Sequence, residues 1–224
     1  MSLFRLGGAR TMVCAAAVVS GVAMVTAAMA LTLADPPAEF GTVPTFAGAD
    51  GSAVPRPSFG GTEDGRAPSS PLAAALVQRV PDRLVLPSLG IAAAVVPVPV
   101  RGDGSLVVPP DPRQVGWWVG GAYPGATTGT VLVAGHVDDV RIGLGALFHV
   151  ASLRQGDLVA LDTPVGRYTY RVMARREYPK QRLPPDLFGQ RGQARLVLVT
   201  CGGSFDPDRG YADNVVIYTE PAAS

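Results

Sequence analysis

Short β-rich runs constrain this sequence more than any other feature. From residue 83 onward, runs of Val, Leu, Ile and Thr alternate with Gly, Pro and Asp, without a long amphipathic helix between them. The runs predict strands over 83–86, 94–98, 106–108, 130–134, 157–162, 167–175, 194–201 and 214–219. Short helices are expected over 72–80, 145–153 and 183–189. We therefore expect a mostly β domain over residues 76–224, folded as a closed barrel or a sandwich.

Residues 1–34 have the character of a membrane segment. Residues 11–34 carry no charged side chain, and a helix of that length can cross the ~30 Å hydrocarbon core of a bilayer. Arg5 and Arg10 precede the apolar run, so the positive-inside bias leaves the N terminus in the cytoplasm. A signal peptide cleaved between residues 30 and 31 is the alternative, because the chain reads Ala-Met-Ala there. Both interpretations export the rest of the chain.

Residues 35–75 form a second segment of different composition. Proline and glycine are frequent there and large apolar residues are few, so the segment cannot bury enough surface to offset the entropy of ordering it. The sequence predicts a disordered linker between the membrane segment and the folded domain.

Charge and cysteine content exclude several classes of protein. The net charge is +1 and 17% of residues are charged, without the basic stripe of a nucleic-acid binder. Two cysteines cannot build a disulfide framework, and Cys14 lies inside the apolar membrane segment. Cys201 is therefore the lone thiol of the exported part. Nothing in the pattern indicates an oligomer, so a monomer is expected.

Two continuously apolar runs end in reactive residues. The run 130–134 leads through a glycine to His136, and the run 196–200 leads to Cys201. Strands that are apolar at every position are buried on both faces, and their ends are rigid mounting points. An imidazole can take the proton of a thiol, and a fixed guanidinium such as Arg209 can hold a developing oxyanion. The pattern is typical of a thiol enzyme that acts on carbonyl groups.

Simpler interpretations of the same residues stay open at this point. A buried cysteine is often only a small core residue, and Arg209 by itself is typical of a surface charge. A metal site built from His136, Asp138 and Asp139 is conceivable, but no further cluster of ligands accompanies it. We therefore expect neither a metal nor another cofactor.

Several longer strings resemble one enzyme family. Residues 131–138 (Val-Leu-Val-Ala-Gly-His-Val-Asp) and 198–206 (Leu-Val-Thr-Cys-Gly-Gly-Ser-Phe-Asp) resemble the two signature segments of sortases. Segments 84–91, 115–118 and 211–216 also match, in the same order along the chain. The combination of Gly-Trp-Trp, His-Val-Asp and Thr-Cys-Gly-Gly looks most like the class F sortases of actinobacteria.

The resemblance implies a fold and a reaction. Sortases are membrane-anchored cysteine transpeptidases built on an eight-stranded β-barrel. They cleave Leu-Pro-x-Thr-Gly-type sorting signals between Thr and Gly through a thioacyl-enzyme, and an amine of the cell wall or its precursor resolves that intermediate. We therefore expect a single-pass protein of the cell membrane whose catalytic domain is extracellular and whose substrates are exported proteins.

The resemblance also implies roles for individual residues. Cys201 takes the place of the nucleophile and His136 that of the general acid/base, while Thr200 helps to shape the oxyanion site. Ala134 and Val199 fall where the family lines the groove for the Leu-Pro part of the signal.

For the arginine, the resemblance implies that Arg209 positions the substrate or stabilises the oxyanion. The segment between the cysteine and this arginine is about one residue shorter than expected, so Arg195 and Arg182 are alternatives.

Two other functions are weighed against this one. A surface-anchored binding module could keep the barrel without turnover. An L,D-transpeptidase would carry a Ser-His-Gly-Cys-x-Arg string, whereas here Leu-Val-Thr precedes Cys201.

Overall fold

The fold is taken from a computed structural model that describes residues 39–43, 71–101 and 105–222. The predicted membrane span over 11–34 and most of the predicted linker lie outside the described residues. Among the helices that are described, none is long and apolar enough to cross a membrane. The first helix, α2 (Pro71–Val77), replaces the one expected over 72–80 and ends in tight turns before Pro81.

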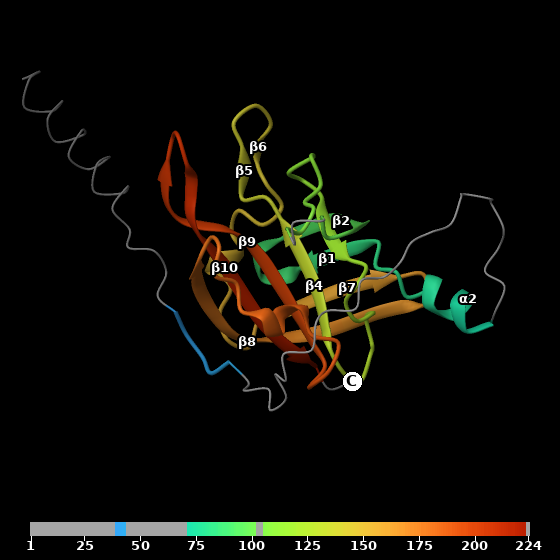
Figure 1. Cartoon of the computed structure of the whole chain (residues 1–224). Helices are drawn as coiled ribbons and strands as arrows, with labels where there is room; N and C mark the ends of the chain where they lie inside the picture. Colours follow the sequence, from blue (N-terminus) through green and yellow to red (C-terminus); the bar gives the residue numbers. More distant parts are fainter. Residues whose placement is uncertain (1–38, 44–70, 102–104, 223–224) are drawn as a thin grey trace, which may run out of the picture. The chain divides into compact units, whose positions relative to one another are not determined.

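Eight strands close into a barrel (Figure 1), the fold that the resemblance implies; the strand pattern alone left a sandwich open. Their order around the barrel is β1-β2-β3-β4-β9-β10-β8-β7. The strands are β1 (Arg83–Leu86), β2 (Ile91–Val98), β3 (Val115–Trp118), β4 (Thr130–Gly135), β7 (Leu158–Thr163), β8 (Gly166–Pro179), β9 (Arg195–Asp206) and β10 (Gly210–Pro221). Two of the pairings, β2 with β3 and β4 with β9, are parallel, and the others are antiparallel. A short hairpin of β5 (Asp138–Asp139) and β6 (Gly143–Leu144) stands apart from the barrel.

The side chains of β4 and β9 alternate between two apolar layers. One layer fills the barrel interior and includes Val131, Val133, Leu196 and Leu198, together with residues of every other barrel strand. The second layer covers the outer face and includes Leu132, Ala134, Val197 and Val199. A 3-10 helix, η3 (Pro185–Phe188), contributes to this outer layer through its buried Leu187. Both strands are therefore buried on both faces, which explains why they are apolar at every position.

The strand predicted over 106–108 does not form, and another segment takes its place in the barrel. Residues 106–108 make only an isolated bridge to Val100, and Pro109 and Pro110 prevent the run from continuing as a strand. The barrel strand in this region is instead β3, where Trp117 enters the interior core and Trp118 enters the outer layer. The sequence pattern does not indicate β3, because a glycine interrupts its four residues.

The other predicted helices are shorter than expected. Within 145–153 the chain forms only the 3-10 helix η2 (Val150–Ser152), preceded by tight turns. In and around η2 the buried residues Leu147, Val150 and Leu153 recur every third position, which is the 3-10 period rather than the α-helical one. Within 183–189 only η3 forms, and a further 3-10 helix, η1 (Pro87–Leu89), joins β1 to β2.

Residues 39–43, which the composition places in the linker, lie along β8. Phe40 forms a bridge with Arg175, whose guanidinium lies over the Phe40 ring at 4.9 Å. The carboxylate of Glu39 accepts a 2.9 Å hydrogen bond from the Glu177 backbone. The Phe40 carbonyl accepts a 2.7 Å hydrogen bond from Arg176. One aromatic ring and one carboxylate thus order a segment whose average composition predicts disorder.

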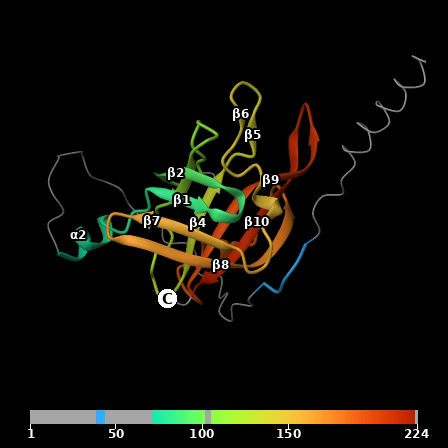
Figure 2. The same cartoon turned by 180° about the vertical axis from the view of Figure 1, so that it is seen from behind.

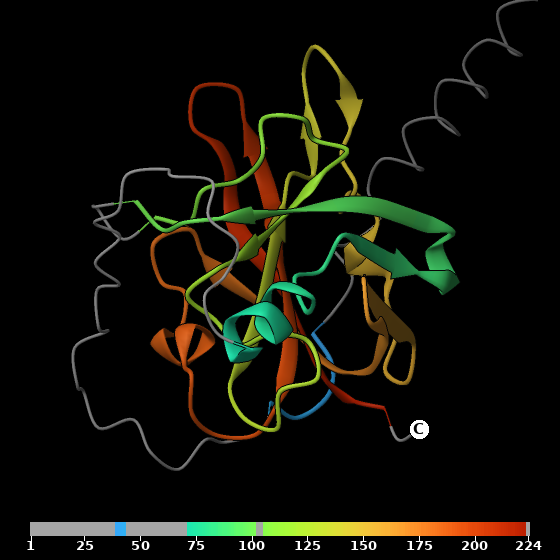
Figure 3. The ribbon, with the colours of Figure 1, turned by 90° about the vertical axis from the view of Figure 1, so that its right-hand side faces the viewer.

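Two hairpins project from the same end of the barrel. Figure 1 shows the β9–β10 hairpin and the β5–β6 hairpin rising together, and the same arrangement is visible from behind and from the side (Figures 2 and 3). Exposed apolar side chains are frequent on both: the β5–β6 hairpin carries Val140, Ile142 and Leu144, and the β9–β10 hairpin carries Phe205. His136 and Cys201 lie where β4 and β9 enter this end of the barrel.

Candidate active site

The register of two parallel strands brings the candidate imidazole and thiol to one place. In the β4–β9 ladder, Val133 lies beside Leu198 and Ala134 beside Val199. Two further steps along both strands reach His136 and Cys201 at the same level. Side chains alternate with a period of two, so both residues continue the outer face that carries Ala134 and Val199. Both are partly exposed, whereas the strand residues before them are buried.

A buried hydroxyl ties these two strand ends together. Thr200 Oγ1 donates a 2.8 Å hydrogen bond to the carbonyl oxygen of Gly135. Gly135 directly precedes His136 and Thr200 directly precedes Cys201. The side chain thus extends the ladder by one rung at the point where the backbone pairing ends, and it fixes the spacing between the imidazole and the thiol.

Glycines let other chain segments approach the site closely. A Cβ on Gly202 would lie 2.5 Å from Val215 Cγ2, and one on Gly203 would lie 2.2 Å from the Asp213 carboxylate. On the other strand, a Cβ on Gly135 would lie 2.9 Å from Val115 Cγ1. The small residues beside His136 and Cys201 are therefore required by packing, as the sequence indicates.

The Cys201 thiol has a cationic neighbour. Lys180 Nζ donates a hydrogen bond to Cys201 Sγ at 2.7 Å. No hydrogen bond between the His136 imidazole and the thiol is recorded in the described part of the chain. A cysteine with an ammonium in contact and an imidazole at the neighbouring strand end has the groups that nucleophilic catalysis by a thiol uses.

The two carboxylates after His136 serve the turns around the site. Asp139 accepts hydrogen bonds from the backbone N–H groups of Arg141 and Ile142, which lower the pKa of its carboxyl group. Asp138 accepts a 2.8 Å hydrogen bond from the hydroxyl of Tyr211. Within the described residues, no group of three or more potential ligands is arranged to hold a metal ion.

Tyr211 connects the two projecting hairpins. Its ring packs against Phe205 with the centroids 5.1 Å apart, and its hydroxyl reaches Asp138 on the neighbouring hairpin. Several causes raise the pKa of Tyr211 to about 12. The largest is burial, and the next two are the hydrogen bond to Asp138 and the negative charge of that residue. The charge of the nearby Cys201 contributes to the same shift. Tyr211 therefore belongs to the surroundings of the thiol, although sequence reasoning gave it no role.

The three candidate arginines lie in different places. Arg209 is exposed at the tip of the β9–β10 hairpin, where Asp206 accepts its backbone N–H. Cys201 and Asp206 are five residues apart on β9, a distance of about 17 Å at the rise of a strand. The structure therefore does not bring Arg209 to the thiol, and its catalytic role stays a prediction.

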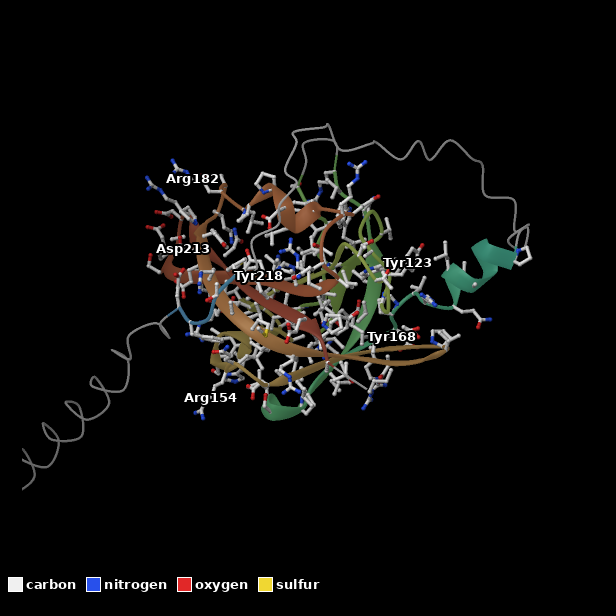
Figure 4. All side chains as sticks on the ribbon, turned by 90° about the horizontal axis from the view of Figure 1, so that it is seen from below. Tyr123, Arg154, Tyr168, Arg182, Asp213 and Tyr218 are labelled. Carbon is white, nitrogen blue, oxygen red and sulfur yellow. The ribbon has the colours of Figure 1, made fainter. Side chains whose placement is uncertain are left out.

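Arg195 begins β9 and lies at the other end of the strand from Cys201. It is buried, donates 2.8 Å to Thr130 Oγ1 and pairs with Asp186 at 3.1 Å. Arg182 is exposed and lies at the margin of the molecule in Figure 4.

The residues predicted to line the groove, Ala134 and Val199, lie on β4 and β9, two positions before His136 and Cys201. Ala134 and Val199 are nearly fully buried in the outer apolar layer. Partly buried Val100, Leu106 and Leu183 pack against that layer. Lys180, which contacts the thiol, was missed because it stands in a loop between strands and matches no motif. Its one available signal is that it is the only lysine in the chain.

Comparison with known proteins identifies one family. The family model described as the Sortase domain matches residues 84–222. No curated protein matches the chain significantly.

Solved structures share the fold. Sortase C-1 from Actinomyces oris is 15% identical, with a TM-score of 0.51, over 70% of this chain and 85% of that chain. Sortase C1 from Streptococcus suis is 13% identical, with a TM-score of 0.51, over 64% of this chain and 73% of that chain. At these identities the likeness extends to the fold alone.

Proposed function

This chain belongs to the sortase family of cysteine transpeptidases, and we propose that it cleaves sorting signals of exported proteins with Cys201 as the nucleophile. The proposed signal is of the Leu-Pro-x-Thr-Gly type, cut between Thr and Gly. The proposed acceptor is an amine of the cell wall or of its precursor. The observation that carries the proposal is the parallel β4–β9 register, which leads to His136 and Cys201 at adjacent strand ends.

The proposed reaction has two transfers of one acyl group. The Cys201 thiolate attacks the Thr carbonyl carbon, and the C=O electron pair moves to oxygen as the C–S bond forms. The tetrahedral intermediate collapses by breaking the C–N bond, and the Gly amine leaves with a proton from His136. The incoming amine then attacks the thioester and gives up its proton to His136. Collapse of the second intermediate forms the new amide and returns the thiolate.

Supporting residues complete the proposed site. Thr200 holds the strand ends together from within the barrel, which supports a role in shaping the oxyanion site. Ala134 and Val199 belong to an apolar layer next to the thiol, which would suit the Leu-Pro part of a signal where the residues packed over it make room. Arg209 lies at the tip of the β9–β10 hairpin, and we propose that it positions the substrate or stabilises the oxyanion when the hairpin lies over a bound peptide.

We further propose a class and a location. The Gly116-Trp117-Trp118 and Thr200-Cys201-Gly202-Gly203 strings support a class F-like enzyme. The apolar run over 11–34 supports a single-pass anchor in the cell membrane, with the barrel outside the cell.

The test uses the full chain in detergent micelles. Wild type and Cys201→Ala are incubated with a Leu-Pro-x-Thr-Gly peptide and a small amine, and the intact protein and products are weighed by mass spectrometry. We expect a thioacyl adduct and a new amide product in the wild type, and neither in Cys201→Ala. Absence of the adduct on folded wild type, across a panel of motif variants, would favour the binding-module alternative.

The arginine is tested in the same assay. Arg209→Ala is compared with Arg195→Ala, and the melting temperature of each variant is recorded beside its turnover. Loss of turnover in a stable Arg209→Ala variant supports its proposed role. Near-normal turnover in that variant contradicts it.

A further inference from the structure

We propose that Lys180 is a catalytic residue that supplies the positive charge beside the Cys201 thiolate. This inference rests on the proposed function, because it assigns a partner to the proposed nucleophile. Its basis is the 2.7 Å contact between Lys180 Nζ and Cys201 Sγ, the atom that would react.

The backbone of Lys180 is held beside the site from both sides. Its N–H donates to the Ala212 carbonyl at 3.2 Å, and its carbonyl accepts the Asn214 side-chain amide at 3.1 Å. Asn214 is buried and is the direct cross-strand partner of Cys201 in the β9–β10 ladder. The residue paired with Cys201 therefore also anchors the lysine, so the contact with the thiol is built into the fold.

The side chain reaches the thiol across one strand. β8 ends at Pro179, which pairs with Asp213 of β10, and β10 in turn pairs with β9. The chain turns at Lys180, directly after β8. A lysine has a long flexible stem that suits such a reach, and its ammonium can approach the sulfur as a point charge.

Ionisable groups also come from the end of β4 and from β10, the strands nearest to Cys201 in the barrel. His136 follows β4 at the same level as Cys201, and Asp138 lies two residues further on. Tyr211 and Asp213 come from β10, Tyr211 through its charge interaction with Cys201 and Asp213 beside Gly203. Asp138 and Asp213 bring negative charge to this end of the barrel, so a cation in contact with the sulfur has an electrostatic use there.

The proposed role of the Lys180 charge follows from its contact with the Cys201 sulfur. A fixed ammonium favours the thiolate over the thiol, and the proton that leaves sulfur goes to His136. When the C–S bond forms, the sulfur loses its negative charge and the acyl oxygen gains it. The ammonium can then stabilise this oxyanion, provided that it stays protonated. Lys180 keeps its three protons throughout and forms no bond to the acyl group.

The experiment measures the reactivity of Cys201 without a peptide substrate. The full chain with Cys14→Ala, in detergent micelles, is treated with iodoacetamide, a neutral reagent that the ammonium does not attract. Alkylation rates are recorded across pH for wild type, Lys180→Met and Lys180→Arg, and thermal melting confirms folding. We expect Lys180→Met to slow alkylation at neutral pH about tenfold and to move the profile to higher pH. Lys180→Arg should retain most of the rate.

Other outcomes would overturn the inference. An unchanged alkylation rate in folded Lys180→Met would do so, as would an equal loss in Arg182→Met, which removes an exposed cation two residues away. A stable acyl group on Lys180 during peptide turnover would show a neutral, nucleophilic amine instead. Failure of the proposed function looks different: no peptide is cleaved, while alkylation still depends on Lys180.

Discussion

Thr200 and Gly135 are joined by a 2.8 Å hydrogen bond, which fastens two strand ends one residue before Cys201 and one before His136. A similar bond exists at the far end of the same strand, where Thr219 Oγ1 donates to the Leu196 carbonyl at 2.8 Å. Both threonines are buried, with 3% of each exposed. The pair allows the effect of a lost hydrogen bond on stability to be separated from its effect on the site.

Thr200→Val is expected to lower the free energy of unfolding by about 1–3 kcal/mol, because a buried carbonyl loses its donor. Thr219→Val should lower the free energy of unfolding by a similar amount. Turnover in the peptide assay should fall at least tenfold more in Thr200→Val, since only that variant loosens the spacing of His136 and Cys201. Equal turnover in the two variants would contradict the role of Thr200 at the site.

Arg195→Met is expected to lower the free energy of unfolding by about 2–4 kcal/mol in urea titrations. The guanidinium is 4% exposed and joins η3 to the start of β4 and β9 through Asp186 and Thr130. The partially exposed Asp186 keeps some hydration when its partner is lost, so the cost stays below that of a fully buried pair. Arg154→Met, on an exposed turn, is the control and should change stability by less than about 0.5 kcal/mol.

Gly203→Ala should destabilise the protein more than Gly210→Ala. Both glycines have left-handed backbone angles, with φ of 74° and 76°, so each substitution carries a strain of about 1–2 kcal/mol. A Cβ at Gly203 also meets the Asp213 side chain, whereas one at Gly210 has open space around it. The melting temperatures of the two variants measure the difference, and equal values would show that β10 moves away at no cost.

Tyr211→Phe is expected to loosen the two hairpins while leaving the barrel intact. The hydroxyl group that reaches Asp138 is lost, so hydrogen exchange should speed up in β5–β6 and at the start of β10. Unchanged exchange in both hairpins would contradict a role of the Asp138 hydrogen bond in holding them together.

Ionisation of the Tyr211 hydroxyl makes the free energy of unfolding depend on pH in the alkaline range. The pKa of Tyr211 is raised to about 12, whereas an unperturbed tyrosine ionises near 10. The folded protein binds the phenolic proton more tightly, so this contribution is complete below pH 10 and is lost as pH rises toward 12. Wild type should therefore lose more stability than Tyr211→Phe across that interval. Parallel losses in the two proteins would exclude Tyr211 as the source.

The sequence by itself determined seven of the eight barrel strands, and it placed His136 and Cys201 at the ends of two apolar runs. Patterning is local: β4 and the first half of β9 are apolar throughout because each is buried on both faces. The strings around His136 and Cys201 were sufficient to indicate the family that the domain model identifies. Local pattern failed at β3, where a four-residue stretch with a glycine gave too weak a signal.

Only the tertiary structure decided which groups meet. Closure of the barrel made β4 and β9 parallel neighbours, although 65 residues separate Thr130 from Arg195. It left Arg209 at a hairpin tip and brought Lys180, from a loop after β8, to the thiol. Contacts of this kind depend on strand register and on the packing of distant segments, which no short stretch of sequence encodes.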